Sequence, residues 1–129
     1  MSDETAPRTV MSVCVTCRRD GEAERVGERL FAALQAAGGP AVAVRPVQCL
    51  SVCKRACTVA LSGPGRYTYL FGDLDPDRDV AALLEGARLH AEAEHGFLLW
   101  RERPEALRRG TVARVPPLGW SPADGRPPR

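Results

Sequence analysis

Apolar and polar residues alternate over residues 9–15, and the run is rich in β-branched side chains, which predicts a strand. Between residues 22 and 37 the apolar residues recur at helical spacing, and Gly38, Gly39 and Pro40 follow as a helix end. Residues 41–47 are predicted to form a second strand. Pro46 lies within that strand and favours an edge position or an early end.

Two shorter runs, residues 58–61 and 66–71, are predicted to be strands of an antiparallel hairpin. The connecting residues 62–65, Ser-Gly-Pro-Gly, have the composition of a turn. The segment 111–115 is predicted to be either a further strand or an extended arm.

A second amphipathic helix is predicted to start near Asp75 and to continue to Gly96. Asp75 is expected to act as the N-cap and Pro76 to occupy the first helical position, with further acidic residues near the positive end of the helix dipole. The alternating aspartates are Asp73, Asp75, Asp77 and Asp79. We interpret them as capping residues, because the glycine and the terminal glutamate of a calcium-binding loop are missing.

The predicted order is β-α-β-β-β-α, with the first two strands parallel if they are neighbours. This order indicates an α/β, thioredoxin-like single domain. We expect the domain to span residues 9–118, between a flexible N-terminus (1–8) and a flexible, extended Pro/Arg-rich tail (119–129).

Composition narrows the class of protein. The chain has 129 residues, of which 44% are hydrophobic, enough for one packed core. The first ten residues contain no apolar run and no later segment is long enough to span a bilayer, so we predict a cytoplasmic protein with no membrane association. The net charge is only +2 and basic stripes interleaved with aromatic residues are missing, so no nucleic-acid partner is predicted.

Five cysteines fall into two sets, and they carry the strongest chemical signal in the sequence. Cys14 and Cys17 follow the first predicted strand; Cys49, Cys53 and Cys57 follow the second. A reducing compartment disfavours disulfides and favours metal binding or redox chemistry. Because parallel strands deliver their following loops to the same end of a sheet, we expect the two sets to converge.

We predict that Cys14, Cys17, Cys49 and Cys53 hold a 2Fe-2S cluster, which requires four thiolates around a small rhomb. Zinc bound by the same thiolates, for structure or for metal trafficking, is an alternative. A second alternative is a dithiol oxidoreductase, because Cys-x-x-Cys after a strand is also the thioredoxin signature.

The segment Cys49-Leu50-Ser51-Val52-Cys53, with the strand after it, resembles the second half of the motif of thioredoxin-like 2Fe-2S ferredoxins. Residues 13–118 also resemble an uncharacterised bacterial family of small predicted metal-binding proteins, the domain of unknown function 1636. The matching segments are Val13 to Arg18, Cys49 to Leu61, Tyr67 to Leu74 and Ala113 to Leu118. The resemblance implies a thioredoxin-like fold, a bound cluster used for electron transfer or cluster sensing, and a loose association with cobalamin-related genes.

The sequence departs from the ferredoxin pattern in two places. Only two residues separate Cys14 from Cys17, where those ferredoxins have about ten or more, and Cys57 stands where they tend to have proline. Cys57 is therefore an alternate ligand replacing Cys17, a reserve thiol, or a small buried apolar residue at the start of a strand.

Basic residues flank both cysteine sets; they are Arg18, Arg19, Lys54 and Arg55. Positive charge beside thiolates lowers their pKa and raises the reduction potential of a cluster. The alternative interpretation is that these are ordinary solvated charges of two loops.

No hydrolytic arrangement of residues is found, so we predict an electron carrier or metal-binding protein rather than an enzyme. His90 and His95 are expected to be solvated or helix-terminal residues, not ligands. Trp100 and Trp120 flank the basic tail and are candidates for a partner-docking surface, with core packing or simple exposure as the alternative. The expected partner is a redox or metal-delivery protein, and a homodimer is also considered.

Overall fold

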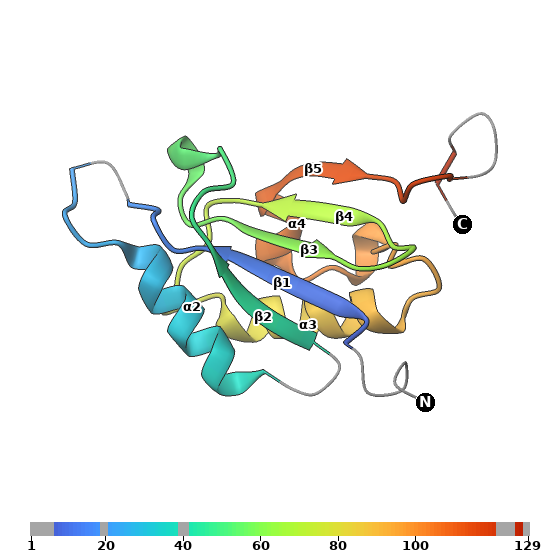
Figure 1. Cartoon of the computed structure of the whole chain (residues 1–129), viewed down its shortest axis with the longest axis horizontal. Coiled ribbons are helices and arrows are strands. Elements are labelled where there is room, and N and C mark those ends of the chain that lie inside the picture. Colours follow the sequence, from blue (N-terminus) through green and yellow to red (C-terminus); the bar gives the residue numbers. More distant parts are fainter. Residues whose placement is uncertain (1–6, 19–20, 39–41, 121–125, 128–129) are drawn as a thin grey trace.

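The computed structural model describes residues 7–18, 21–38, 42–120 and 126–127. Figure 1 shows its elements, which in chain order are β1 (Thr9–Cys14), α2 (Val26–Ala37), β2 (Val42–Val47), the 3-10 turn η1 (Cys53–Arg55), β3 (Val59–Ser62), β4 (Thr68–Phe71), α3 (Val80–Glu92), the 3-10 turn η2 (Trp100–Glu102), α4 (Glu105–Gly110) and β5 (Thr111–Val115).

The strands form one five-stranded sheet in the order β2-β1-β3-β4-β5. β1 and β2 are parallel, as the α2 crossover between them requires, and all other neighbours are antiparallel. β2 is an edge strand, which confirms the prediction made from Pro46. The predicted strand–helix–strand–hairpin–helix order is therefore confirmed.

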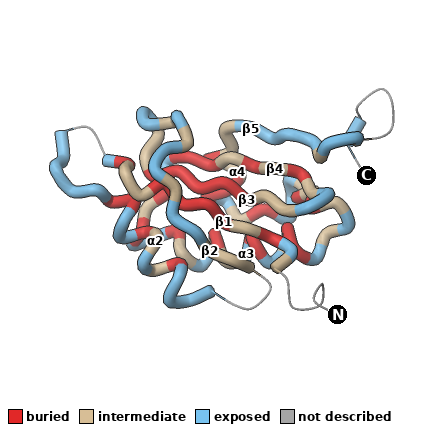
Figure 2. Tube along the Cα trace, viewed as in Figure 1, coloured by how far each residue is buried: buried red, intermediate tan, exposed pale blue. Residues whose placement is uncertain are grey.

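The core lies between one face of the sheet and the helices. α2 and α3 contact each other and both contact β1 and β2, while α4 packs against α3. In Figure 2 the buried residues gather along the strands and on the helix surfaces turned toward them. The largest fully buried side chains include Met11, Leu30, Tyr69, Phe71 and Leu83.

The C-terminal third contains regular structure where the sequence analysis left two alternatives, a strand or an extended arm. Residues 111–115 are a strand, β5, which pairs with β4 along the edge of the sheet. The short helix α4 precedes it and ends at Gly110. Because Gly110 has no side chain, the end of α4 can lie close to Gly72, whose carbonyl oxygen would be 2.5 Å from a Cβ at position 110. The predicted flexible segments lie largely outside the described residues, which exclude 1–6, 121–125 and 128–129.

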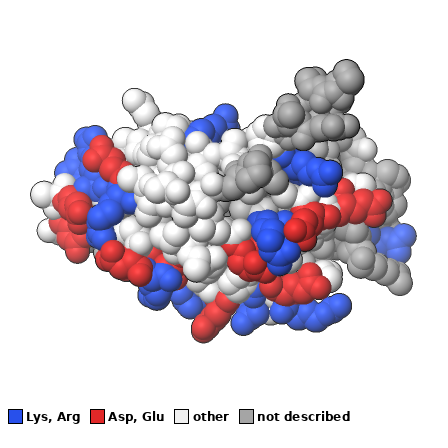
Figure 3. All heavy atoms as spheres, turned by 90° about the horizontal axis from the view of Figure 1, so that it is seen from below, with Lys and Arg blue, Asp and Glu red and all other residues white. Residues whose placement is uncertain are grey.

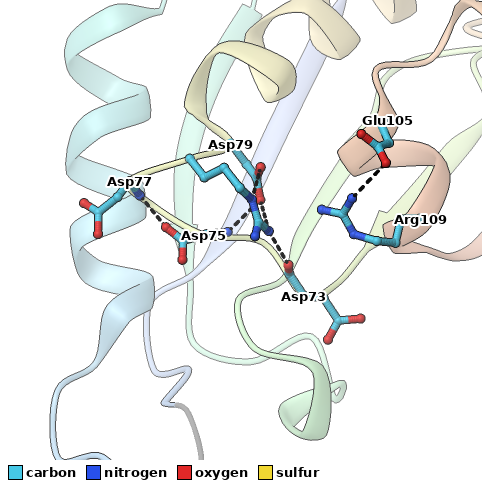
Figure 4. Close-up of polar contacts among 7 residues, drawn as sticks. Asp73, Asp75, Asp77, Asp79, Glu105 and Arg109 are labelled. Atoms are coloured by element: carbon cyan, nitrogen blue, oxygen red, sulfur yellow. Dashed lines mark hydrogen bonds and ion pairs between the residues drawn. The ribbon is translucent and has the colours of Figure 1, made fainter.

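Helix α3 begins later than predicted. Its first residue is Val80 and its N-cap is Asp79, so the expectation that Asp75 caps the helix was wrong. Residues 75–79 instead form a turn, in which the N–H of Asp77 donates to Oδ1 of Asp75 at 2.7 Å and the N–H of Asp75 donates to Oδ2 of Asp79 at 2.9 Å (Figure 4). These carboxylates bind backbone N–H groups, as expected for a turn that precedes a helix.

His90 was expected to be a solvated or helix-terminal residue, and the expectation that it is solvated was wrong. The imidazole is 0% exposed, although it does lie near the end of α3. α3 ends at Glu92 rather than near Gly96, and the sheet covers the side of the helix that carries His90. His95 is half-buried, with its ring edge-on to Trp120.

No helix in the described part of the chain is long and apolar enough to cross a membrane. On the face seen in Figure 3, acidic and basic side chains are interspersed, and no charge of one sign covers it.

Candidate metal centre

The two cysteine sets begin side by side because β1 and β2 end side by side. Cys14 is the last residue of β1 and is in register with Val47, the last residue of β2. The next residue continues the pairing, with the N–H of Val15 donating to the carbonyl of Val47 at 2.9 Å. Parallel pairing thus brings together two segments that lie more than thirty residues apart in the sequence.

Cys14 and Cys17 form a buried pair. Their Sγ atoms are 3.1 Å apart, and the hydroxyl of Thr58 lies 3.6 Å from Sγ of Cys17. The first turn of α2 packs directly on this segment: the N–H of Gly27 donates to the carbonyl of Cys17 at 3.4 Å. A Cβ on Gly27 would lie 2.0 Å from the carbonyl oxygen of Cys14, so only glycine permits this contact.

The two thiols of this pair have opposite pKa shifts. Burial raises the pKa of Cys14, but hydrogen bonds from the side chains of Thr16 and Cys17 and from the backbones of Thr16 and Leu50 outweigh it, so the pKa lies below its usual value. Burial and the neighbouring Cys14 together raise the pKa of Cys17 to about 11. Cys17 therefore holds its proton more tightly than Cys14, and donates it toward the Cys14 sulfur; a metal ion that bound both sulfurs would displace that proton.

Cys49 and Cys53 form a second pair, on the surface. Their Sγ atoms are 3.9 Å apart and both side chains are exposed. Ser51, whose φ is +64°, turns the loop so that its N–H donates to Sγ of Cys49 at 3.2 Å. The hydrogen bond and charge of Cys49 raise the pKa of Cys53, and the charge of Cys14 adds to the effect.

Direct contacts connect the first pair to the backbone of the loop that carries the second pair. The thiol of Cys14 lies 3.6 Å from the carbonyl oxygen of Gln48, and Thr16 donates a hydrogen bond from its hydroxyl to the same carbonyl. The Leu50 backbone also bonds to the Cys14 sulfur. The expected convergence of the two segments is thus observed, although no three His, Cys, Asp or Glu side chains of the described residues gather tightly enough to form a metal site.

Cys57 lies apart from these pairs, in the hydrophobic core. It is 0% exposed and packs among the buried residues of the sheet. Its backbone exchanges two hydrogen bonds with Leu74, at 3.2 and 3.1 Å, and its peptide bond with Ala56 is cis. Of the three roles considered for Cys57, a buried small residue at the start of a strand agrees best with this position.

The flanking charges differ in their surroundings. Lys54 and Arg18 are exposed, and Arg19 lies outside the described residues. Arg55 is held by Asp73, with Nη2 2.7 Å from Oδ2, and its carbonyl accepts the N–H of Asp73 at 2.6 Å. Arg55 therefore fixes η1 to the loop after β4, a role that the sequence did not reveal.

Sequence reasoning also missed the polar residues that position the sulfurs. Thr16, Gln48 and Thr58 each contact a cysteine or its neighbour. Thr16 and Gln48 are adjacent to cysteines in the sequence, but nothing in their spacing shows that they bond across the two loops.

Comparison with known proteins gives a family and a fold. The model of the family described as "Protein of unknown function (DUF1636)" matches residues 11–117. No curated protein shows significant similarity to the chain.

Among solved structures, a thioredoxin-like [2Fe-2S] ferredoxin from Aquifex aeolicus is similar with a TM-score of 0.58 and 20% identity, over 90% of this chain and 100% of that one. A second structure, the wild-type thioredoxin-like [2Fe-2S] ferredoxin from the same organism, has a TM-score of 0.53 and 20% identity, over 84% and 99%. The predicted thioredoxin-like fold is therefore confirmed.

Proposed function

The chain belongs to the DUF1636 family, and from that premise we propose that it is a small electron-carrying protein that holds a 2Fe-2S cluster through Cys14, Cys17, Cys49 and Cys53. The observation that carries the proposal is the contact between Cys14 and the loop of Cys49 through the carbonyl of Gln48. The fold shared with ferredoxins that bind such a cluster supports it.

The donor atoms fit a soft inorganic centre. Four thiols lie in two close pairs, and thiolates are the ligands that iron–sulfur clusters and zinc prefer. Backbone groups of Leu50 and Ser51 bond to Cys14 and Cys49, which is the kind of contact that stabilises thiolate charge. A bound 2Fe-2S cluster would supply reversible one-electron transfer.

The protein residues have separate roles in this proposal. The buried Cys14 and Cys17 form the rigid half of the site, since β1 and the start of α2 fix them. The exposed Cys49 and Cys53 form the accessible half, which is open to a cluster donor or a redox partner. Lys54 places positive charge beside the accessible half and offsets part of the thiolate charge.

Cluster reconstitution under anaerobic conditions tests the proposal. The purified chain should take up iron and sulfide at two atoms of each per chain and gain a visible absorption band that dithionite bleaches. Cys14→Ser and Cys49→Ser should each lose most of the bound iron, whereas Cys57→Ala should keep it. A chain that stays colourless, or that loses iron equally when Cys57 is replaced, contradicts the proposed ligand set.

Zinc is the second candidate, because the same four thiols are a complete tetrahedral donor set. Elemental analysis of the protein as isolated separates the two: zinc at one atom per chain, without sulfide, would favour a structural or trafficking site.

The structure gives little support to the dithiol oxidoreductase alternative. Cys14 is only 1% exposed, whereas an attacking thiol must reach its substrate. α2 begins at Val26, and the contacts of its first turn with Cys14 and Cys17 are to their backbone carbonyl groups rather than to the sulfurs, where the helix dipole would favour a thiolate. The expected assay result is no thiol-dependent reduction of insulin.

A further inference from the structure

A cleft lies at the β5 edge of the sheet, at the opposite edge from β2 and away from the cysteines. Its volume is about 620 Å³, and its lining residues are Phe97, Trp100, Arg103, Thr111 and Arg114. These residues come from the segment after α3, from η2 and from β5, so the fold of the C-terminal third creates it. The lining holds two guanidinium groups, two aromatic rings and a hydroxyl, and no carboxylate.

Arg103 is the most unusual residue of this cleft because its charge is buried. The residue is only 5% exposed, and a buried charge is costly unless it is paired. Nε and Nη2 donate to the carbonyl of Leu98 at 3.0 and 2.8 Å, and Nη1 donates to the hydroxyl of Thr111 at 3.2 Å. Within the described part of the chain no carboxylate forms an ion pair with Arg103, so its charge has no counter-ion there.

The hydrogen bonds of Arg103 leave part of its donor capacity for a ligand. A guanidinium carries five N–H bonds, and the three contacts to Leu98 and Thr111 use three of them. A further hydrogen bond goes to the hydroxyl of Tyr69, so one N–H is left for a ligand. The same three contacts lock the side chain in place, which is the arrangement expected of a preorganised anion receptor.

Aromatic rings form the walls beside the charges. Cζ of Arg103 lies 5.3 Å from the ring centroid of Trp100 and 5.1 Å from that of Tyr69. Arg114, the second cation, stands with its Cζ 5.1 Å from the ring centroid of Phe97. Trp100 is 61% exposed, so most of this large residue is open to solvent although Arg103 lies against its ring.

We propose that this cleft binds a small organic anion with a flat aromatic ring, its carboxylate or phosphate group between Arg103 and Arg114 and its ring against Trp100 and Phe97. Carboxylate and phosphate share the pair of oxygens that a guanidinium binds. Aromatic anchors with a few fixed polar groups are typical of small-molecule sites. The proposal does not depend on the cluster, because none of the five lining residues is a cysteine or bonds to one.

Titration of the full-length protein with benzoate and with phenyl phosphate tests the proposal, using calorimetry and the NMR shift of the Trp100 indole N–H. We expect saturable binding with a Kd of about 1 mM for at least one of them, a reasonable affinity for ligands of this size. The tighter of the two identifies the headgroup. Acetate, inorganic phosphate and benzyl alcohol, each of which lacks either the ring or the charge, should bind about tenfold more weakly.

Two exposed positions serve for the variants, because Arg103 is buried and its replacement could unfold the chain. Arg114→Gln and Trp100→Ala should each weaken benzoate or phenyl phosphate binding about tenfold. Arg101→Gln is the matched control, an exposed arginine of η2 that does not line the cleft, and it should bind like the wild type. Absence of saturable binding by both aromatic anions, equal binding by acetate and inorganic phosphate, or unchanged binding by both variants would overturn the proposal.

Discussion

The hydroxyl of Thr9 lies 2.7 Å from Nδ1 of His90, although the two residues are 81 positions apart in the sequence. Nε2 of the same ring lies 2.7 Å from the carbonyl of Tyr67, which can only accept, so Nε2 carries the proton and Nδ1 accepts from Thr9. A fully buried neutral imidazole therefore connects α3 to β1 and to the start of β4. Protonation would place a second proton against the Thr9 contact and a charge inside the core.

Stability should fall in mild acid because of His90. Burial lowers the pKa of His90, so the unfolded chain takes up a proton before the folded one. The stabilisation is fully present above the unfolded pKa of about 6.5 and is lost as the pH falls toward the lower folded pKa, by at most about 1.4 kcal/mol per pH unit. Urea unfolding of the reduced protein between pH 7.5 and 5 measures this slope.

His95→Gln is the matched control for that experiment, since His95 is half-buried on the surface. It should keep the slope of the wild type, while His90→Gln should flatten it and lower the stability at pH 7.5. A wild-type free energy of unfolding that does not change between pH 7.5 and 5 would contradict the assignment.

Gly27→Ala should destabilise the protein even though alanine is the better helix former. The new Cβ would lie 2.0 Å from the carbonyl oxygen of Cys14, so α2 has to move away from the end of β1. We expect a loss of about 1–3 kcal/mol, the usual cost of overpacking, together with weaker metal retention. Ala36→Gly, on the exposed side of α2, should cost about 1 kcal/mol through helix propensity alone and leave metal retention unchanged.

Cys57→Ala should separate a packing role from a ligand role. Because Cys57 lies in the core, the substitution should lower the free energy of unfolding by about 1 kcal/mol and leave the iron content unchanged. Cys14→Ala, also buried, is the comparison and should lose iron. Iron per chain and urea denaturation of the same samples give both quantities, and a Cys57→Ala protein without iron would restore Cys57 as a ligand.

Lys54 and Arg55 should affect a bound cluster unequally. Arg55 is already paired with Asp73, whereas Lys54 is exposed beside Cys53 and forms no ion pair among the described residues. Lys54→Gln should therefore make the centre harder to reduce, and Arg55→Gln should change its potential less but loosen the loop. Protein-film voltammetry of both variants, with Arg101→Gln as a distant control, measures the difference; equal shifts for Lys54→Gln and Arg101→Gln would exclude local tuning.

The fold could be predicted where a local pattern and a topological rule agree. The α2 crossover forces β1 and β2 to be parallel, and Gly63 with its neighbours forces the next two strands into a hairpin. The parallel pairing of β1 and β2 is enough to bring the two cysteine segments together at one end of the sheet. These rules were sufficient to predict the thioredoxin-like order of helices and strands.

Features fixed by tertiary contacts could not be predicted in the same way. His90 resembles any polar residue near a helix end, and only the position of Thr9 and the carbonyl of Tyr67 makes it a core residue. The turn of Asp75 to Asp79 has the composition of a cap but bonds to itself and, through Asp77, to Arg29 of α2 at 2.6 Å. Which thiol is buried also depends on packing, not on spacing.

Pro46 lies in β2, at the outer edge of the sheet, and contributes no N–H group to that edge. A neighbouring copy that paired with this edge would lack a hydrogen-bond donor near the C-terminal end of β2, next to the exposed Arg45. The edge is thereby protected against strand-by-strand growth into larger aggregates. Association of two copies through this edge is therefore disfavoured.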